Sequence, residues 1–244
     1  MKGPEMKTKT FSIATLVLAV LATSQSVFAQ AYGEAYQSFI NTLQYNNTYN
    51  YTKNSSKRSS GTAKSKSTTP DPVPSHNVVE DTAVTPEQVK RAVQFRSTGT
   101  RLALDEYVNS FRATAEEKAE WKVRLTELLS GFDALSASRG FPNDVAFALA
   151  FSIALNSSVY NEKPLVPDAK LLEMREMIAI RLTRIRLLEK TSDHEKQGIY
   201  EYTVMTAQMT YYCREEAKRE RDIEELKRCK QLAALNLRRL GIEP

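Results

Sequence analysis

Residues 145–155 (VAFALAFSIAL) place the strongest constraint on what this chain can fold into. Every face of a helix formed by this run would be apolar except at Ser152. A helix without a polar face must be surrounded by protein or lipid, and a run of this length is too short to span a bilayer. We therefore expect it to form the central helix of an all-α domain, with Asn143 or Asp144 as its N-cap.

Helix start and stop signals surround this segment. They predict a single helical bundle domain of about six or seven helices over residues 85–244. Three capping boxes are expected, in which a Ser or Thr at the N-cap pairs with a Glu or Gln three residues later: Thr85 with Gln88, Thr114 with Glu117 and Ser192 with Glu195. The first of these helices should reach about Ser97, and a short helix should follow around residues 104–111. The helix after Thr114 should stop at Gly140, and the one beginning at Pro167-Asp168 should reach about Lys190.

Two of these helices carry apolar residues at helical spacing, which predicts a face directed at the core. The first set is Trp121, Leu125, Leu128, Leu129, Phe132 and Leu135, and the second is Leu171, Met174, Ile178, Leu182, Ile185 and Leu188. No segment shows the alternation typical of a strand, and no 34-residue repeat is present.

The first 29 residues have the pattern of a cleaved secretory signal peptide. Lys2, Lys7 and Lys9 precede an apolar run at 11–22, and Val27-Phe28-Ala29 fits the small-x-small cleavage rule. This run is short against the roughly 20 residues that span a bilayer. Cleavage after Ala29, or after Ala31, predicts a secreted or periplasmic protein with no stable membrane span.

Two different segments separate this signal from the helical domain. Residues 30–45 form a short aromatic amphipathic segment, because Tyr32, Tyr36, Phe39, Ile40 and Leu43 share one helical face. Such a segment could dock on the helical domain or bind a partner. Residues 46–84 are rich in Asn, Thr, Ser, Lys and Pro and have too little apolar area to offset their ordering entropy. They predict a disordered polar linker.

The charge balance argues against nucleic acid as a partner. The formal net charge is +5, and residues 1–29 contribute three Lys against one Glu, so removing them takes away +2 and leaves +3. A charge this small over the remaining chain is too weak to attract a polyanion. The alternating signs of residues 214–221 predict a solvated surface with ion pairs.

The spacing of the two cysteines distinguishes one long C-terminal helix from a helical hairpin. Cys213 and Cys229 are 16 residues apart, which is about 24 Å along a continuous helix, whereas a disulfide needs Cα atoms within roughly 7 Å. A break near Arg219–Arg221, with Asp222 as N-cap and Glu225 closing a capping box, would instead form a helical hairpin that brings them together. An exported chain with two cysteines is expected to pair them, so we predict the hairpin and the disulfide. The alternative is two free thiols on one long helix.

Few residues offer catalytic or cofactor-binding chemistry. His76 lies in the linker and His194 begins a helix, so neither a zinc site nor a Ser/His/Asp triad is expected, and no cofactor motif is present. Paired carboxylates could still hydrolyse a cell-wall glycan. The candidate carboxylates for such a pair are Glu116, Glu117, Glu120 and Asp144.

Five polar residues flank the two ends of the apolar helix and could line a ligand pocket. They are Arg139, Asn143 and Asp144 at its start, and Asn156 and Tyr160 at its far end. The alternative is that they satisfy the backbone groups of helix ends.

These features favour an exported, non-enzymatic binding or interaction module of the cell envelope or extracellular space. Its partner would be an unknown protein or envelope component, and its oligomeric state is open. The alternatives are a cell-wall hydrolase with paired carboxylates and a carrier of a small apolar ligand in a cavity around residues 145–155.

Residues 142–150 (PNDVAFALA), residues 156–160 and the ending at 235–241 also carry a family resemblance. The chain resembles a family of secreted bacterial proteins catalogued only as a domain of unknown function. The resemblance implies a signal peptide, a variable polar segment and a helical domain over residues 85–244. It implies no catalytic or binding residue.

Overall fold

The computed structural model describes residues 83–244. The predicted signal peptide, the aromatic segment at 30–45 and nearly all of the predicted linker lie outside these residues.

The described part of the chain contains helices and no strands, which confirms the all-α prediction. Seven helices follow one another along it: α3 (Pro86–Val93), α4 (Leu104–Asn109), α5 (Ala115–Ser138), α6 (Val145–Asn161), α7 (Asp168–Arg184), α8 (Asp193–Glu220) and α9 (Ile223–Arg239).

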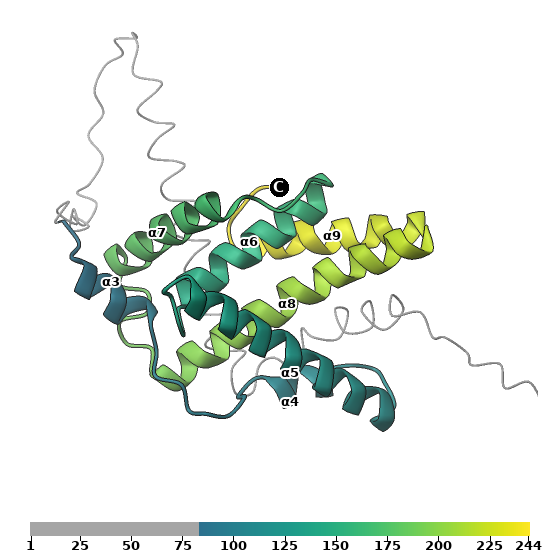
Figure 1. The fold of residues 1–244 in the computed structure, drawn as a ribbon, viewed down its shortest axis with the longest axis horizontal. Coiled ribbons are helices and arrows are strands. Elements are labelled where there is room, and N and C mark those ends of the chain that lie inside the picture. The colour runs from purple at the N-terminus through teal and green to yellow at the C-terminus, as the bar shows by residue number, and fades with distance from the viewer. Residues whose placement is uncertain (1–82) are drawn as a thin grey trace, which may run out of the picture.

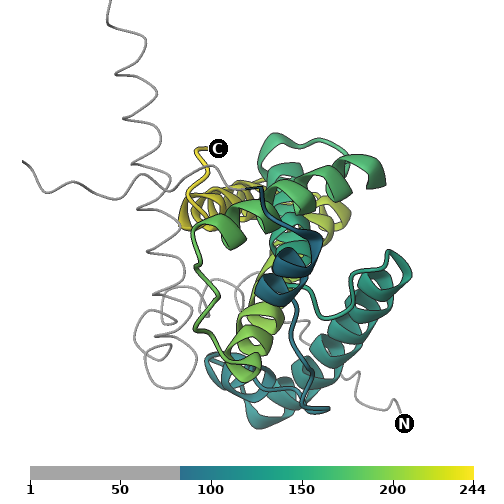
Figure 2. The ribbon, with the colours of Figure 1, turned by 90° about the vertical axis from the view of Figure 1, so that its left-hand side faces the viewer.

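The apolar helix α6 lies at the centre, as its sequence predicts. It packs against α7, α8 and α9, which surround it in Figure 1. Phe147 is fully buried, and the rings of Phe132 and Phe141 stack on it with centroids 5.6 and 5.9 Å away. Helix α5 packs against α4 and α8, on the side of the molecule away from α9 (Figure 2).

Side-chain N-caps mark where α3, α5, α6 and α8 begin. The three predicted capping boxes, at Thr85, Thr114 and Ser192, are all present with both of their hydrogen bonds. Helix α6 is capped by Asp144, whose side chain accepts a hydrogen bond from the backbone N–H of Phe147.

Helix α3 ends at Val93, so the predicted end near Ser97 is wrong. Gln94 is extended and forms an isolated antiparallel bridge with Asp144. The next backbone N–H, that of Phe95, donates to the carbonyl of Asn143 at 3.2 Å. This pairing with the start of α6 replaces the hydrogen bonds that would have continued the helix.

Helix α7 ends at Arg184 and not near Lys190. Arg186 has a φ of 53°, in the left-handed region that stops a helix, and the N–H of Leu187 then donates to the carbonyl of Leu182. The inward side chain of Leu188 is nevertheless buried beyond the end of the helix. Some members of the predicted core faces are half-buried, namely Leu128, Leu135, Met174, Ile178 and Ile185.

Helices α8 and α9 form an antiparallel hairpin, which appears at the yellow end of the colour range in Figure 1. Arg221 between them adopts a left-handed conformation with a φ of 57°. Asp222 then caps α9 by accepting from the N–H of Glu225 at 2.9 Å. The predicted reciprocal bond from the Glu225 side chain is not formed, because that carboxylate turns towards Cys213 and Arg228.

Candidate functional site

The five residues predicted to line a pocket occupy two separate places. Arg139, Asn143 and Asp144 lie together where α5 passes into α6. Asn156 and Tyr160 lie near the other end of α6, and Asn156 is 12 residues, or about 18 Å, from Asp144 along the helix axis. The structure therefore does not bring the two groups into one site.

The first place is built around a buried ion pair between Asp144 and Arg175 of α7. Oδ1 of Asp144 accepts from the Phe147 N–H at 2.8 Å, and Oδ2 pairs with the Arg175 guanidinium. Asp144 is completely buried, Arg175 is 5% exposed, and the guanidinium carbon lies 4.2 Å from the ring centroid of Phe141. Burial raises the pKa of Asp144, although the charge and hydrogen bond of Arg175 oppose the rise.

The neighbours of this pair hold the helix junction together. Asn143 has a φ of 53°, a conformation that Asn tolerates better than most residues, and its carbonyl accepts from Phe95. Arg139 forms a partly exposed ion pair with Asp168 at the start of α7. These contacts match the alternative in which the polar residues satisfy helix ends.

The second place is a buried polar seam between α6, α8 and α9. The Asn236 side-chain amide of α9 donates to Oδ1 of Asn156 at 3.1 Å and to Oγ1 of Thr210 at 3.0 Å. Asn156 in turn donates to the carbonyl of Ser152 at 2.8 Å. One side chain from each helix therefore meets in the seam, which fixes the register of the three helices.

Arg214 continues this polar interior towards the hairpin. Its Nη1 donates to the carbonyl of Ser158 at 3.0 Å and to the Ser158 hydroxyl at 2.8 Å. Its Nε donates to Glu215 at 2.7 Å, and its guanidinium lies over the ring of Tyr211. Tyr160, the last of the predicted pocket residues, packs against the small apolar cluster that contains the disulfide.

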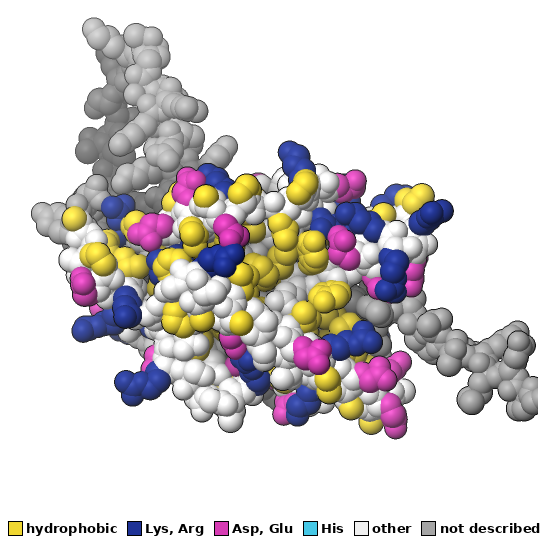
Figure 3. Space-filling model, viewed as in Figure 1, with side chains coloured by type: hydrophobic (Ala, Val, Ile, Leu, Met, Phe, Trp, Pro, Cys, Tyr) yellow, Lys and Arg dark blue, Asp and Glu magenta, His cyan; other side chains and the backbone are white. Residues whose placement is uncertain are grey.

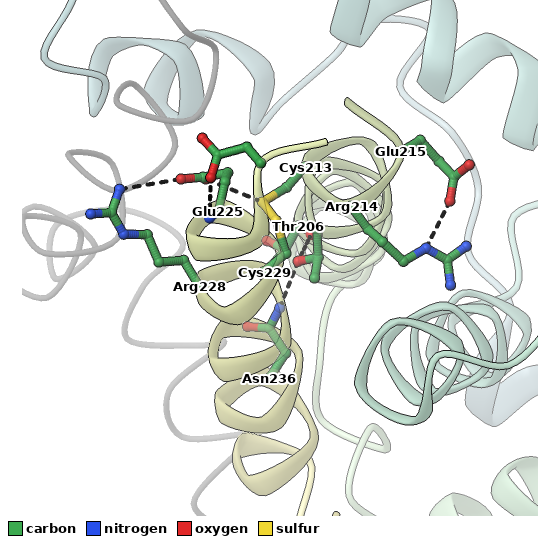
Figure 4. Close-up of a disulfide and its surroundings, with 10 residues drawn as sticks. Thr206, Cys213, Arg214, Glu215, Glu225, Arg228, Cys229 and Asn236 are labelled. Carbon is green, nitrogen blue, oxygen red and sulfur yellow. Dashed lines mark hydrogen bonds and ion pairs between the residues drawn. A yellow bond between two sulfur atoms is a disulfide. The ribbon is translucent and has the colours of Figure 1, made fainter. Parts of the chain in front are cut away.

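Cys213 and Cys229 form that disulfide, with their Cα atoms 5.8 Å apart. The bridge joins the last third of α8 to the middle of α9, and both cysteines are buried. Glu225 lies beside it, with Oε1 3.6 Å from the sulfur of Cys213 and Oε2 3.2 Å from Arg228 (Figure 4). Burial raises the pKa of Glu225, while Arg228 acts in the opposite direction.

A third polar cluster, which sequence patterns did not indicate, lies at the start of α8. The carboxylate of Glu201 is fully buried and accepts from the backbone N–H groups of Leu102 and Ala103 at 2.8 and 2.9 Å. Gln197 donates to Glu201 at 2.8 Å and accepts from the N–H of Thr98 at 2.9 Å. Two side chains of α8 thus hold the segment that leads into α4.

Lys196 and Tyr200 extend this cluster. The Lys196 ammonium donates to the carbonyl of Arg91 at 3.1 Å near the end of α3, and burial lowers the pKa of Lys196. The Tyr200 hydroxyl donates to Asp133 at 2.7 Å, and Asp133 also pairs with Arg101. Burial is the main cause that raises the pKa of Tyr200.

The candidate carboxylates for hydrolysis are dispersed. Asp144 is buried in its ion pair, and Glu117 is half-buried and engaged in the capping box of α5. Glu116 and Glu120 lie in the first turns of α5, whereas Asp144 is the N-cap of α6. His194 is exposed in the first turn of α8, and His76 lies outside the described residues.

Within residues 83–244, the only group of three or more His, Cys, Asp or Glu side chains close enough together to share an ion is Cys213, Glu225 and Cys229. No helix in this part of the chain is both long and apolar enough to cross a membrane.

The face drawn in Figure 3 mixes basic and acidic side chains, with hydrophobic side chains between them. Large side chains that are well exposed in the described region include Met177 of α7 and Ile223 of α9, at 55% and 67%. This face therefore presents apolar side chains among charges of both signs.

No curated protein and no solved structure matches the chain. A protein-family model described as "Family of unknown function (DUF6683)" matches residues 7–244, which is nearly the whole sequence. The chain therefore belongs to this family of unknown function.

Proposed function

We propose that this protein is an exported, non-enzymatic interaction module that binds a protein or another component of the cell envelope. The main observation behind the proposal is that Asp144 is buried and that both of its carboxylate oxygens are engaged. Asp144 is the candidate catalytic carboxylate at the start of the apolar helix, and its oxygens are engaged by the Phe147 N–H and by Arg175.

A paired-carboxylate hydrolase needs two carboxyl groups that face a substrate across roughly 5–9.5 Å. Asp144 would first have to break its ion pair with Arg175 to serve in such a pair. A carrier would need room for a ligand beside residues 145–155, but Phe147 is packed between aromatic rings of α5 and the α5–α6 junction. The interior of the bundle thus favours a structural role for these residues.

Export is supported by two features. Residues 1–29 have the pattern of a signal peptide, and the buried Cys213–Cys229 bridge is the kind of bond that persists in oxidising compartments. We therefore place the protein in the periplasm or outside the cell.

We favour two separate contact positions, at exposed apolar side chains of α7 and at the start of α9, which lie at opposite ends of the molecule in Figure 1. Met177 and Ile223 each leave more than half of their surface in solvent, so each offers an apolar contact point to a partner. Their neighbours Glu176 and Glu224 are exposed and charged, so the chain itself supplies matched control positions.

Site-specific photo-crosslinking in cells that naturally make the protein tests this proposal. A photoreactive phenylalanine at position 177 or 223 should give a discrete crosslinked band, while the same group at 176 or 224 should give a weaker band or none. The absence of a band at both apolar positions, or equal bands at all four positions, would contradict an interaction through these side chains. Release of soluble fragments from purified cell wall by the purified protein would favour the hydrolase instead.

A further inference from the structure

The end of the α8–α9 hairpin brings a carboxylate and two cysteines together. Glu225 is 4% exposed and points one carboxylate oxygen at a disulfide, which can neither donate a hydrogen bond nor balance its charge. Arg228 pairs with the other oxygen, Oε2, so the charge is balanced from that side, whereas Oε1 faces the sulfur of Cys213. The sulfur atoms of Cys213 and Cys229 and an oxygen of Glu225 all lie within 4.8 Å of one another.

We propose that Cys213, Cys229 and Glu225 bind a divalent metal ion such as Zn²⁺ when the disulfide is reduced. Two thiolates and one carboxylate are a donor set suited to zinc, with a fourth position left for water. The same two sulfur atoms would then close the hairpin in either of two ways, by a direct bond or through the metal.

The backbone positions the three ligands from two directions. Glu225 and Cys229 are four residues apart, which places them one turn apart on the same face of α9. Cys213 faces them from α8, and its Cα lies 5.8 Å from that of Cys229. Zn–S bonds of about 2.3 Å in a tetrahedral site need the sulfurs about 3.8 Å apart, a separation that side-chain rotation can supply at this backbone distance.

The hairpin has other contacts that would keep the ligands together after reduction. Arg221 makes the turn, Asp222 caps α9, and Asn236 bonds to Thr210 farther down the two helices. Ala217 and Ala233, both buried, pack with the cysteines in the same small cluster. The separation of Cys213 and Cys229 is therefore not set by the disulfide alone.

The two oxygens of Glu225 have different partners, which orients the carboxylate. Arg228 contacts Oε2 at 3.2 Å, so Oε1 is the oxygen left facing the sulfurs (Figure 4). Metal-binding carboxylates are commonly held by such an outer hydrogen-bond donor. A divalent cation would also offset most of the negative charge of two thiolates and a carboxylate.

The redox step that precedes binding is a two-electron reduction. A phosphine reductant breaks the S–S bond and is oxidised to the phosphine oxide with an oxygen from water, and the two sulfurs become thiols. Binding of the metal then releases the thiol protons to solvent. A dithiol reductant would do the same and would itself become a disulfide.

Co²⁺ titration of the phosphine-reduced, purified protein tests the proposal, because a thiolate bound to Co²⁺ gives an intense near-ultraviolet charge-transfer band. We expect one Co²⁺ per chain, displaced by Zn²⁺, and no such band from the oxidised protein. Glu225→Gln should weaken binding by at least about tenfold, while Glu224→Gln, at an exposed position on the same helix, should bind as the unchanged protein does.

Two results would overturn the proposal: no charge-transfer band from the reduced protein, or equal affinity in Glu225→Gln and the unchanged protein. Circular dichroism of each variant checks that it is folded. X-ray absorption of the unchanged, reduced, zinc-loaded protein needs no variant, and it should report two sulfur ligands at about 2.3 Å with lighter atoms completing the shell. A shell without sulfur would contradict the site directly.

Discussion

Asp144 at the start of α6 and Arg175 in the middle of α7 form an ion pair that is almost fully withdrawn from solvent. The pair is 31 residues apart in sequence and joins the helix at the centre of the bundle to one of its neighbours. Asp144 also caps α6, so a single carboxylate both begins the central helix and ties it to α7.

Removing Arg175 should destabilise the protein strongly, because the charge of Asp144 would remain buried without its partner. We expect Arg175→Met to lower the free energy of unfolding by about 3–5 kcal/mol in urea denaturation. Lys170→Met is the matched control, since Lys170 forms an exposed pair with Glu173 on the same helix, and its cost should stay below about 1 kcal/mol. Similar losses of unfolding free energy in both variants would contradict a larger stabilising contribution from the buried pair than from the exposed one.

The destabilisation of Arg175→Met should also depend on pH. Burial already raises the pKa of Asp144, and removing Arg175 takes away a charge that lowers it. The folded variant then binds a proton more tightly than the unfolded chain, so its stability falls as pH rises through the raised pKa. Urea denaturation between pH 4 and 7, as an approximate working range for a carboxyl group, should show the gap to the unchanged protein widening with pH. A constant gap would contradict ionisation of Asp144 as the cause.

The disulfide should stabilise the helical hairpin by restricting the unfolded chain. Replacing both cysteines, as in Cys213→Ala/Cys229→Ala, should lower the free energy of unfolding by about 3 kcal/mol in the chain-entropy model. Reduction of the unchanged protein without added metal should have a similar effect. An unchanged melting temperature in both experiments would contradict this role of the bridge.

Glu201 should hold the segment before α4 in place. In Glu201→Gln an NH2 group replaces one carboxylate oxygen. This donor would then face another donor, either the Gln197 amide or the N–H groups of Leu102 and Ala103. We expect a loss of about 1–3 kcal/mol in the free energy of unfolding and faster amide exchange at Leu102 and Ala103. Glu220→Gln, at an exposed position at the end of α8, should change stability by less than about 0.5 kcal/mol. Unchanged exchange at both amides would contradict the anchoring role.

Alkaline pH should weaken the fold through Tyr202. Burial raises the pKa of this phenol from 10.0 to about 12, so the folded state binds the proton more tightly than the unfolded chain. The stabilising contribution is complete below the unfolded value of 10.0 and is lost as pH rises through about 12. Tyr202→Phe should therefore lose less stability over this interval in urea denaturation, whereas Tyr212→Phe, at a half-exposed position, should behave as the unchanged protein does.

Local signals in the sequence predicted most of the fold. Capping boxes mark where α3, α5 and α8 begin, and the apolar run at 145–155 identifies the central helix. The predicted ends of α3 and α7 were wrong because no Gly or Pro marks them. The end of α3 depends on backbone pairing of Gln94 and Phe95 with residues 143–144. The end of α7 is followed by Arg186 in a left-handed conformation.

The buried charges were harder to predict, because their partners are distant in sequence. Arg175 is 31 residues from Asp144, Arg214 is 56 from Ser158 and Glu201 is 98 from Ala103. The sequence of α7 does contain one indication of a buried charge. Arg175 lies between Leu171 and Ala179 at intervals of four residues, so it occupies an inward position on that helix and needs a buried partner.

Hydrogen exchange followed by NMR or mass spectrometry on the unchanged protein tests the central claim most directly, which is that α6 is enclosed by α7, α8 and α9. We predict that the backbone amides of Phe147 and Leu149 exchange only when the whole described region unfolds, with the same opening free energy as urea denaturation gives. Exchange of these amides through a smaller local opening, faster than that of α7, would contradict a closed bundle around α6.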